Sequence, residues 1–256
     1  MADDPRAEFA EIAASLRAYL EWQDATGASG TPRRAAVVPT APQSAAAIAQ
    51  VAAQPSEQHL RLPQLAGEVA ACQKCGLSTT RIQTVFARGN PSASLCFVGE
   101  APGADEDAQG LPFVGRAGQL LDRMIGAMGL SPEKDAYICN ILKCRPPGNR
   151  RPEPDEIATC IPYLHEQLAL VHPRVIVALG NTAVAALLES KLGITKMRGQ
   201  WKLYRGQTLV MPTYHPSFLL RPGPLQTESK RQAWEDLKLV MEELGLSGKG
   251  AGPRGS

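Results

Sequence analysis

Short apolar segments alternate with longer helical ones, and this alternation constrains the fold more than any other feature of the chain. The apolar segments are bounded by Gly or Pro and cover 95–99, 137–142, 175–179 and 208–211. Between or after them, apolar residues recur at helical spacing over about 118–128, 155–171, 182–189 and 227–244. Such alternation predicts right-handed crossovers that cover both faces of a parallel sheet with helices. We therefore expect an α/β fold, a three-layer α/β/α sandwich with a mainly parallel four-stranded central sheet.

Length and composition predict one globular core with appendages. A chain of 256 residues that is 44% hydrophobic can bury one sizeable core. Apolar residues at helical spacing near the N-terminus predict an amphipathic helix, and an Ala/Pro-rich stretch after it has the composition of a disordered linker. We expect this helix and linker in residues 1–58, the folded domain in 59–246 and a flexible tail in 247–256.

Charge and hydropathy indicate the class of partner and the compartment. No apolar run of about eighteen residues predicts a membrane span, and Met1 to Arg6 does not resemble the start of a secretory signal. We expect a cytoplasmic, nucleoid-associated protein that does not bind membranes. The formal net charge is only +2, so attraction to a nucleic acid requires a local basic surface. Residues 143–151 contain four basic side chains and no acidic one.

Four of the six cysteines have the spacing of metal ligands. Cys72 and Cys75 form a C-x-x-C pair, and Cys144 and Cys160 follow with fifteen residues between them. In a reducing compartment, four thiolates hold a structural zinc ion or an iron–sulfur cluster, and spacing alone does not separate the two. The alternative is four buried apolar thiols. The remaining two cysteines lie inside predicted strands, where a small apolar filler is the better interpretation: Cys96 and Cys139.

Three polar side chains stand where predicted strands end. Glu100 precedes a glycine-containing turn, Asn140 ends the second strand, and His215 follows the fourth. Each alone is weak evidence, because a strand-end Glu is often a cap, a turn Asn is common, and a lone His more often packs or lies on the surface. In an open α/β sheet, however, ligands bind at the carboxyl ends of the strands. We therefore expect these three residues to line one pocket.

The motifs in order resemble those of family 4 of the uracil-DNA glycosylases. The resemblance covers the chain from about Leu65 to Leu244. Its marks are the C-x-x-C pair, Gly99-Glu100-Ala101-Pro102-Gly103, Leu111-Pro112-Phe113-Val114-Gly115-Arg116-Ala117-Gly118, Asn140-x-x-Lys143-Cys144-Arg145-Pro146-Pro147, Cys160 and His215-Pro216-Ser217-x-Leu219-Leu220-Arg221.

The resemblance implies a fold, a cofactor and an activity. It implies a compact α/β/α fold and a [4Fe-4S] cluster on the four cysteines. The spacing of the cysteines leaves structural zinc as the alternative. The implied activity is removal of uracil from single- and double-stranded DNA.

The resemblance also implies a role for each motif residue. Glu100 would position the water, Asn140 would read uracil, and His215 would act at the O2 atom of uracil. Phe113 would stack on the flipped base, and Glu106 would block the methyl group of thymine. The same motifs place three further residues against the substrate: Ala101, Gly103 and Ser217.

Contacts with DNA are expected around this pocket. We expect Leu219 or Phe218 to wedge into the vacated base stack. Because Lys143 is interpreted as a phosphate contact and not as an amine nucleophile, we expect a monofunctional enzyme that does not cleave the strand. The phosphate contacts are expected from four basic residues: Lys143, Arg145, Arg150 and Arg221.

Two alternatives and two partner predictions accompany this reading. One alternative is a relative that captures uracil-DNA covalently through a histidine in the loop after the Asn motif, but 141–159 contains no histidine. The other is a non-catalytic iron–sulfur or zinc module that binds DNA. We expect a monomer, and the N-terminal helix is either a recruiter of a replication or repair protein or a dispensable tail.

Overall fold

The computed structural model describes residues 57–246, with side chains from Leu60 onward. Its first helix, α3 (Glu57–Ala70), begins close to the predicted start of the folded domain at residue 59. The predicted N-terminal helix, most of the predicted linker and the predicted C-terminal tail lie outside the described residues.

The described residues form one six-stranded mixed sheet. Its strand order is β1-β3-β2-β4-β6-β5, and the inner four strands are parallel to one another. The inner four are the predicted strands, so the α/β class is confirmed, but the predicted number of four is wrong. Two short antiparallel strands lie at the edges, and at two and three residues they are too short for a periodic signal. The strands are β1 (Arg88–Gly89), β2 (Leu95–Gly99), β3 (Ala136–Asn140), β4 (Val175–Leu179), β5 (Lys202–Tyr204) and β6 (Thr208–Thr213).

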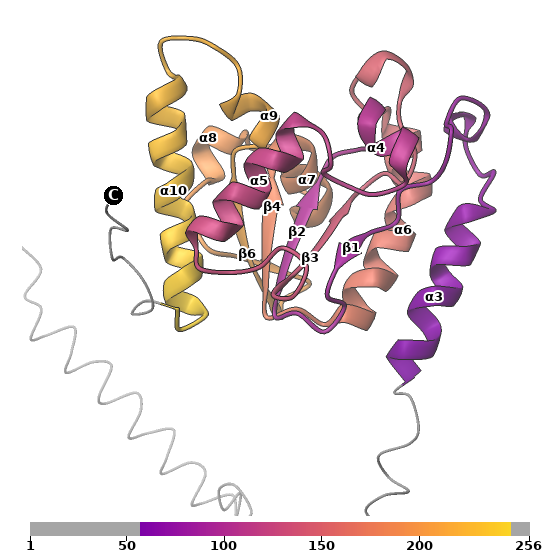
Figure 1. Cartoon of the computed structure of the whole chain (residues 1–256), viewed down its shortest axis with the longest axis horizontal. Helices are drawn as coiled ribbons and strands as arrows, with labels where there is room; N and C mark the ends of the chain where they lie inside the picture. Colours follow the sequence, from indigo (N-terminus) through magenta and orange to yellow (C-terminus); the bar gives the residue numbers. More distant parts are fainter. Residues whose placement is uncertain (1–56, 247–256) are drawn as a thin grey trace, which may run out of the picture. The chain divides into compact units, whose positions relative to one another are not determined.

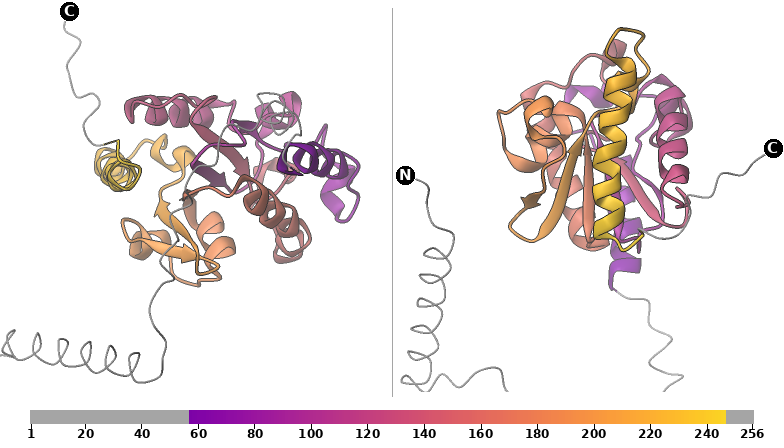
Figure 2. Two further views of the ribbon diagram at one scale, coloured as in Figure 1. Left: turned by 90° about the horizontal axis from the view of Figure 1, so that it is seen from below. Right: turned by 90° about the vertical axis from the view of Figure 1, so that its left-hand side faces the viewer.

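Helices cover both faces of the sheet, as the alternation of strands and helices predicted (Figures 1 and 2). Helices α5 and α10 pack on one face, helices α6 and α7 pack on the other, and α3 packs against α6. The four helices that cover the two faces match the four predicted helical segments to within about two residues: α5 (Arg116–Ala127), α6 (Pro154–Val171), α7 (Gly180–Leu188) and α10 (Gln226–Glu243).

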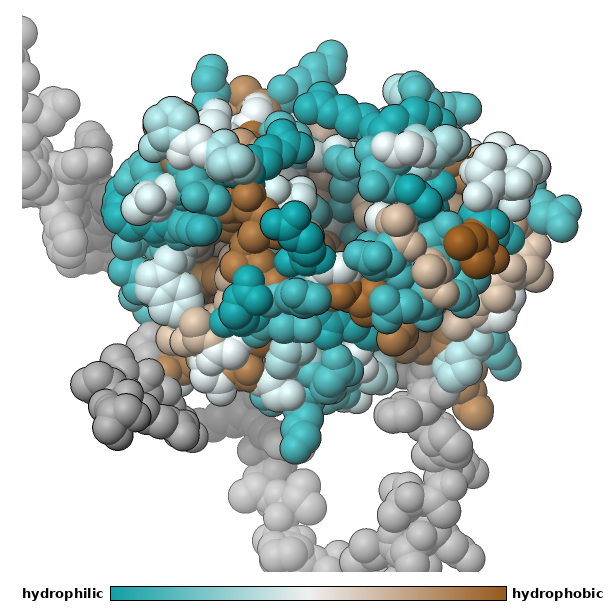
Figure 3. Space-filling view, turned by 45° about the horizontal axis from the view of Figure 1, so that its top comes forward, coloured by the Kyte–Doolittle hydropathy of each residue, from teal (hydrophilic) through white to brown (hydrophobic). Residues whose placement is uncertain are grey.

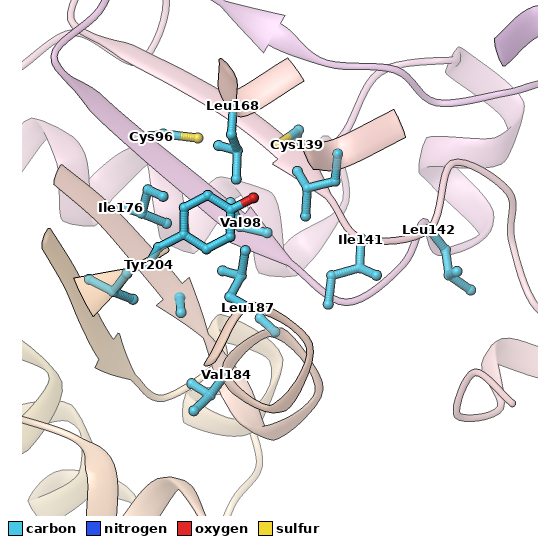
Figure 4. Packing of buried hydrophobic residues seen from close by; sticks show 14 of the residues in the cluster. Cys96, Val98, Cys139, Ile141, Leu142, Leu168, Ile176, Val184, Leu187 and Tyr204 are labelled. Atoms are coloured by element: carbon cyan, nitrogen blue, oxygen red, sulfur yellow. The ribbon is translucent and has the colours of Figure 1, made fainter. Parts of the chain in front are cut away.

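Side chains alternate between the two faces along each inner strand, and because helices cover both faces, each inner strand is buried on both. On β2, Leu95 and Phe97 join the cluster under α5 and α10, whereas Cys96 and Val98 join the cluster under α6 and α7. Figure 4 shows the second cluster, in which Cys96 and Cys139 are fully buried, so their interpretation as apolar fillers is confirmed. Each large aliphatic side chain buried in this way contributes about 1.5–3 kcal/mol.

The strand order brings the carboxyl ends of distant segments to one end of the sheet. From β2 the chain crosses to β3 on one side and later to β4 on the other, which opens a crevice beyond the carboxyl end of β2. Two of the three short helices directly follow a strand at this end. The short helices, which periodicity did not predict, are α4 (Ala104–Gln109), α8 (Ile194–Met197) and α9 (Pro216–Leu219).

None of the helices within the described residues is long and apolar enough to cross a membrane.

Candidate active site

A cleft of about 790 Å³ lies at the carboxyl ends of the inner strands. Glu100, Asn140 and His215 all line it, so the structure brings together the three strand-end residues as their positions predicted. The strands that carry them are β2, β3 and β6, which are separated by long stretches of sequence. Figure 3 brings this end of the molecule forward and shows mostly hydrophilic side chains with hydrophobic surface in hollows between them.

Asn140 presents a buried polar atom that has no hydrogen-bond partner among the described residues. The side chain is only 2% exposed, and within the described residues its Oδ1 accepts no hydrogen bond. An unsatisfied buried acceptor costs about 1–3 kcal/mol, and a ligand N–H in the cleft would remove this cost. Gly99 allows this placement, because a Cβ at that position would overlap Asn140 Oδ1 and the ring of Phe113.

Phe113 forms an apolar wall of the cleft in an unusual backbone conformation. Its φ is +56°, in the left-handed region that non-glycine residues rarely adopt. Gly118 makes room for it, since a Cβ there would overlap the Phe113 carbonyl group, and Arg88 donates to that carbonyl oxygen at 3.3 Å. The Phe113 ring lies 5.7 Å from the ring of His215, centroid to centroid. Backbone strain held by several neighbours is typical of functional sites.

The burial and hydrogen bonds of His215 favour a neutral imidazole. It caps the start of α9, where its Nδ1 accepts the Ser217 N–H at 3.1 Å and lies 2.8 Å from Ser217 Oγ. Burial, with a smaller effect from the charge of Arg221, lowers the pKa of His215 to about 4. The imidazole is therefore uncharged near pH 7. With Nδ1 as acceptor, its proton lies on Nε2, so Ser217 fixes the tautomer.

Glu100 is held by a residue that the sequence did not single out. Thr182, on α7, donates from its Oγ1 to Glu100 Oε2 and also lines the cleft. Its position soon after the end of β4 was the available signal, because ligands gather at the carboxyl ends of strands. The sequence analysis considered the residues at the ends of β2, β3 and β6 and did not consider the end of β4.

Glu106 links two loops on one wall of the cleft. Its carboxylate accepts backbone N–H bonds from Gly103 at 3.0 Å and from Val114 and Gly115 at 2.9 Å each. These bonds tie the start of α4 to the loop before α5. Gly103 and Ala101 line the cleft as expected, but the Gly103 N–H is already bound to Glu106 and is not free for a ligand.

Exposed arginines line the cleft. Arg150 is paired with Glu156 at 2.7 Å, which fixes its position. Arg145 is half-buried, binds Asn149 Oδ1 at 2.7 Å and is not among the lining residues. Arg150 and Arg221, two of the expected phosphate contacts, thus face the cleft. The structure adds two further arginines that the sequence analysis did not name individually. The four lining arginines are Arg116, Arg150, Arg151 and Arg221.

Two of the expected DNA contacts do not fit the structure. Lys143 is only 1% exposed, and its Nζ donates to the Asn140 carbonyl oxygen at 2.6 Å, so it does not reach a phosphate. Leu219 is only 2% exposed, because it faces the core from α9, whereas its neighbour Phe218 is 41% exposed and lines the cleft. The predicted roles of Lys143 and Leu219 in DNA contact are therefore corrected, and of the two wedge candidates only Phe218 is exposed.

The four cysteines with metal-ligand spacing converge away from the cleft. They line one small cavity of about 20 Å³, to which three separate segments contribute. Arg81 Nη1 lies 3.2 Å from Cys144 Sγ, and the Lys143 backbone N–H donates to Cys160 Sγ at 3.4 Å. The converging residues are Cys72, Cys75, Cys144 and Cys160.

This cysteine site fits a cationic centre chemically. Burial raises the pKa of Cys160 to about 11, so the free thiol is protonated at neutral pH and binding of a metal centre would release its proton. N–H donors to sulfur, such as Arg81, are the contacts that tune iron–sulfur clusters. Among residues 57–246, however, no three His, Cys, Asp or Glu side chains are arranged to hold a single metal ion.

Comparison with known proteins places the chain among glycosylases. Residues 86–238 match the model of the uracil DNA glycosylase superfamily. The chain is 44% identical to a type-4 uracil-DNA glycosylase of Saccharolobus solfataricus over 72% of this chain and 86% of that protein. It is also 44% identical to a type-4 uracil-DNA glycosylase of Thermotoga maritima over 66% of this chain and 88% of that protein. A third type-4 uracil-DNA glycosylase, from Sulfurisphaera tokodaii, is 45% identical over 71% of this chain and 84% of that protein.

Proposed function

Because this chain belongs to the type-4 uracil-DNA glycosylases, we propose that it releases uracil from DNA by hydrolysing the bond between the base and the sugar. The family resemblance identified from the motifs is confirmed. The single observation that carries the proposed activity is the cleft itself. In it lie together a buried amide whose oxygen has no partner among the described residues, an imidazole and an aromatic ring.

Recognition of uracil is assigned to Asn140 and Phe113. The amide carries an acceptor and a donor side by side, which match the N3–H and O4 of uracil. Cytosine presents an acceptor at N3 and a donor at C4, so it would leave the buried amide mismatched. The Phe113 ring offers a face on which the base stacks, an interaction worth about 1–3 kcal/mol. Glu106, on the wall near Phe113, is proposed to exclude the methyl group of thymine.

The substrate base has to leave the duplex before it enters this cleft. Extrusion costs a few kcal/mol and is easiest for a weak pair or a single strand. Phe218, exposed on α9, is positioned to enter the vacated stack. The arginines along the cleft supply the phosphate contacts that hold the distorted backbone.

His215 is proposed to stabilise the departing base. When the C1′–N1 bond breaks, both electrons leave with uracil, and negative charge develops on its O2. A neutral imidazole that donates from Nε2 to O2 acts as an oxyanion-hole donor. A donor of this kind is typically worth about 3 kcal/mol, or roughly a hundredfold in rate.

Glu100 is proposed to stabilise the positive charge that develops on the sugar and to orient the water that attacks it. The water oxygen forms the new bond to C1′. One water proton passes by way of the carboxylate to solvent, and the uracil anion takes up a proton, so the products are free uracil and an abasic site. The described residues that line the cleft include no lysine, and Lys143 is buried. This supports hydrolysis without an amine intermediate or strand cleavage.

The cysteine site is proposed to hold a [4Fe-4S] cluster, with zinc as the alternative. The cluster would supply structural cross-linking, since hydrolysis needs no electron transfer. Four thiolates would join the loop after α3, the loop after β3 and helix α6. The convergence of four cysteines on one cavity supports either group, and the family resemblance favours the cluster.

Product analysis tests the proposed function. The protein is incubated with single-stranded and duplex oligonucleotides that contain one deoxyuridine, and the products are separated by mass. We expect free uracil and an intact strand with an abasic site. A non-catalytic DNA-binding module would retain the oligonucleotide with no free base, and a covalent-capturing relative would add the mass of the DNA to the protein. Either result would refute the proposal.

A further inference from the structure

The contact between Thr182 and Glu100 joins two elements that are far apart in sequence. Thr182 Oγ1 donates to Glu100 Oε2, and both residues line the cleft. Thr182 engages only Oε2, and within the described residues no hydrogen bond to Glu100 Oε1 is formed, so the second carboxylate oxygen stays available to a ligand. A hydrogen bond to a charged group is worth more than a neutral one, and it restricts the rotation of the carboxylate.

The turn between β4 and α7 brings Thr182 to this position. β4 ends at Leu179, and Gly180 begins α7 with a φ of +86°, a conformation that favours glycine. A Cβ on Gly180 would lie 3.0 Å from His215 Cβ, so the turn passes close beside the imidazole. The first turn of α7 therefore faces the cleft, and its N-terminal end favours a negative charge such as that of Glu100.

We propose that Thr182 is a positioning residue, which fixes the Glu100 carboxylate so that its free oxygen orients the attacking water. The role rests on the proposed function, since it concerns the same cleft and the same water. Thr182 acts through Glu100 and does not recognise the base, which is the task of Asn140 and Phe113. It should therefore affect the rate of the chemical step and not the affinity for uracil.

The test compares two substitutions at Thr182 with one at a distant threonine. Thr182→Val keeps the branched shape and removes the hydroxyl, whereas Thr182→Ser keeps the hydroxyl. Thr208→Val is the matched control, because Thr208 begins β6 at the end of the strand that lies away from His215. The measurements are the single-turnover rate of uracil release and the inhibition constant of free uracil, on protein whose folding is checked by thermal melting.

We expect Thr182→Val to release uracil about ten- to a hundredfold more slowly than the wild type. Thr182→Ser should recover most of the rate, and the control should match the wild type. The inhibition constant of free uracil should stay the same in all variants. A valine variant with the wild-type rate, a serine variant as slow as valine, or a rise in the inhibition constant that parallels the loss of rate would each overturn the role. A wild-type protein that releases no uracil would overturn the proposed function itself.

Discussion

Replacing His215 by Ala should slow uracil release about a hundredfold or more, and by the same factor at every pH between about 5.5 and 8. The variant removes the imidazole, which lines the cleft, and with it the Nε2–H donor. The constant factor follows from the charge state of the imidazole. Nδ1 is occupied by the Ser217 N–H, and burial lowers the pKa of His215 to about 4. The neutral form, which already carries its donor proton on Nε2, therefore predominates across this whole range.

The pH dependence of the wild-type rate separates a neutral donor from a cationic one. With a pKa of about 4, roughly one molecule in a thousand carries a charged His215 at pH 7. If the cation were the active form, the rate of the wild type would rise nearly tenfold for each pH unit on going from pH 7 towards pH 5. If the neutral form is active, His215 contributes no pH dependence above about pH 5.

The assay is single-turnover release of uracil from a single-stranded oligonucleotide, with abasic sites converted to breaks by alkali. The rate of the wild type divided by that of His215→Ala is measured from pH 5.5 to pH 8, so that effects common to both proteins cancel. A ratio that grows steeply as the pH falls would refute the neutral-donor mechanism. A ratio near one at all pH values would remove His215 from the mechanism altogether.

Three further predictions concern the base reader, its packing and the cysteine site. Asn140→Ala should abolish most uracil release and the preference for uracil over cytosine; undiminished release from a U·G duplex would contradict its role. Gly99→Ala should slow release at least about tenfold, because the new methyl group overlaps Asn140 Oδ1; full activity would show that the packing is not tight. Cys75→Ser should lose iron, visible colour and thermal stability, whereas Cys96→Ala should keep its iron; a colourless wild type with stoichiometric zinc would exclude the cluster.

The sequence predicted the inner sheet well because its strands are buried on both faces. β2 and β4 are continuous apolar runs, and their bounds agree with the structure at both ends. Once the strands are parallel, the residues that follow them must meet at one end of the sheet. The convergence of Glu100, Asn140 and His215 therefore follows from topology, and their motifs added the chemistry.

The missed features depend on side-chain direction, which periodicity does not specify beyond the end of a strand. Lysine is rarely buried, so Lys143 in a basic segment was expected on the surface, yet its Nζ turns back to the Asn140 carbonyl. Leu219 and Phe218 are neighbours on one short turn of helix, and their motif does not say which one faces the core. Thr182 carries no distinctive pattern, because its role comes from a contact with a carboxylate 82 positions away.

The central claim is that three strand ends surround one extruded uracil. The most direct measurement is a crystal structure of the Glu100→Gln variant with a uracil-containing oligonucleotide. We predict an extruded uracil in the cleft, with its N3–H and O4 on the Asn140 amide, its O2 on His215 Nε2 and its ring on Phe113. A uracil that stays stacked in the DNA, or that binds elsewhere on the protein while the cleft is empty, would contradict this account.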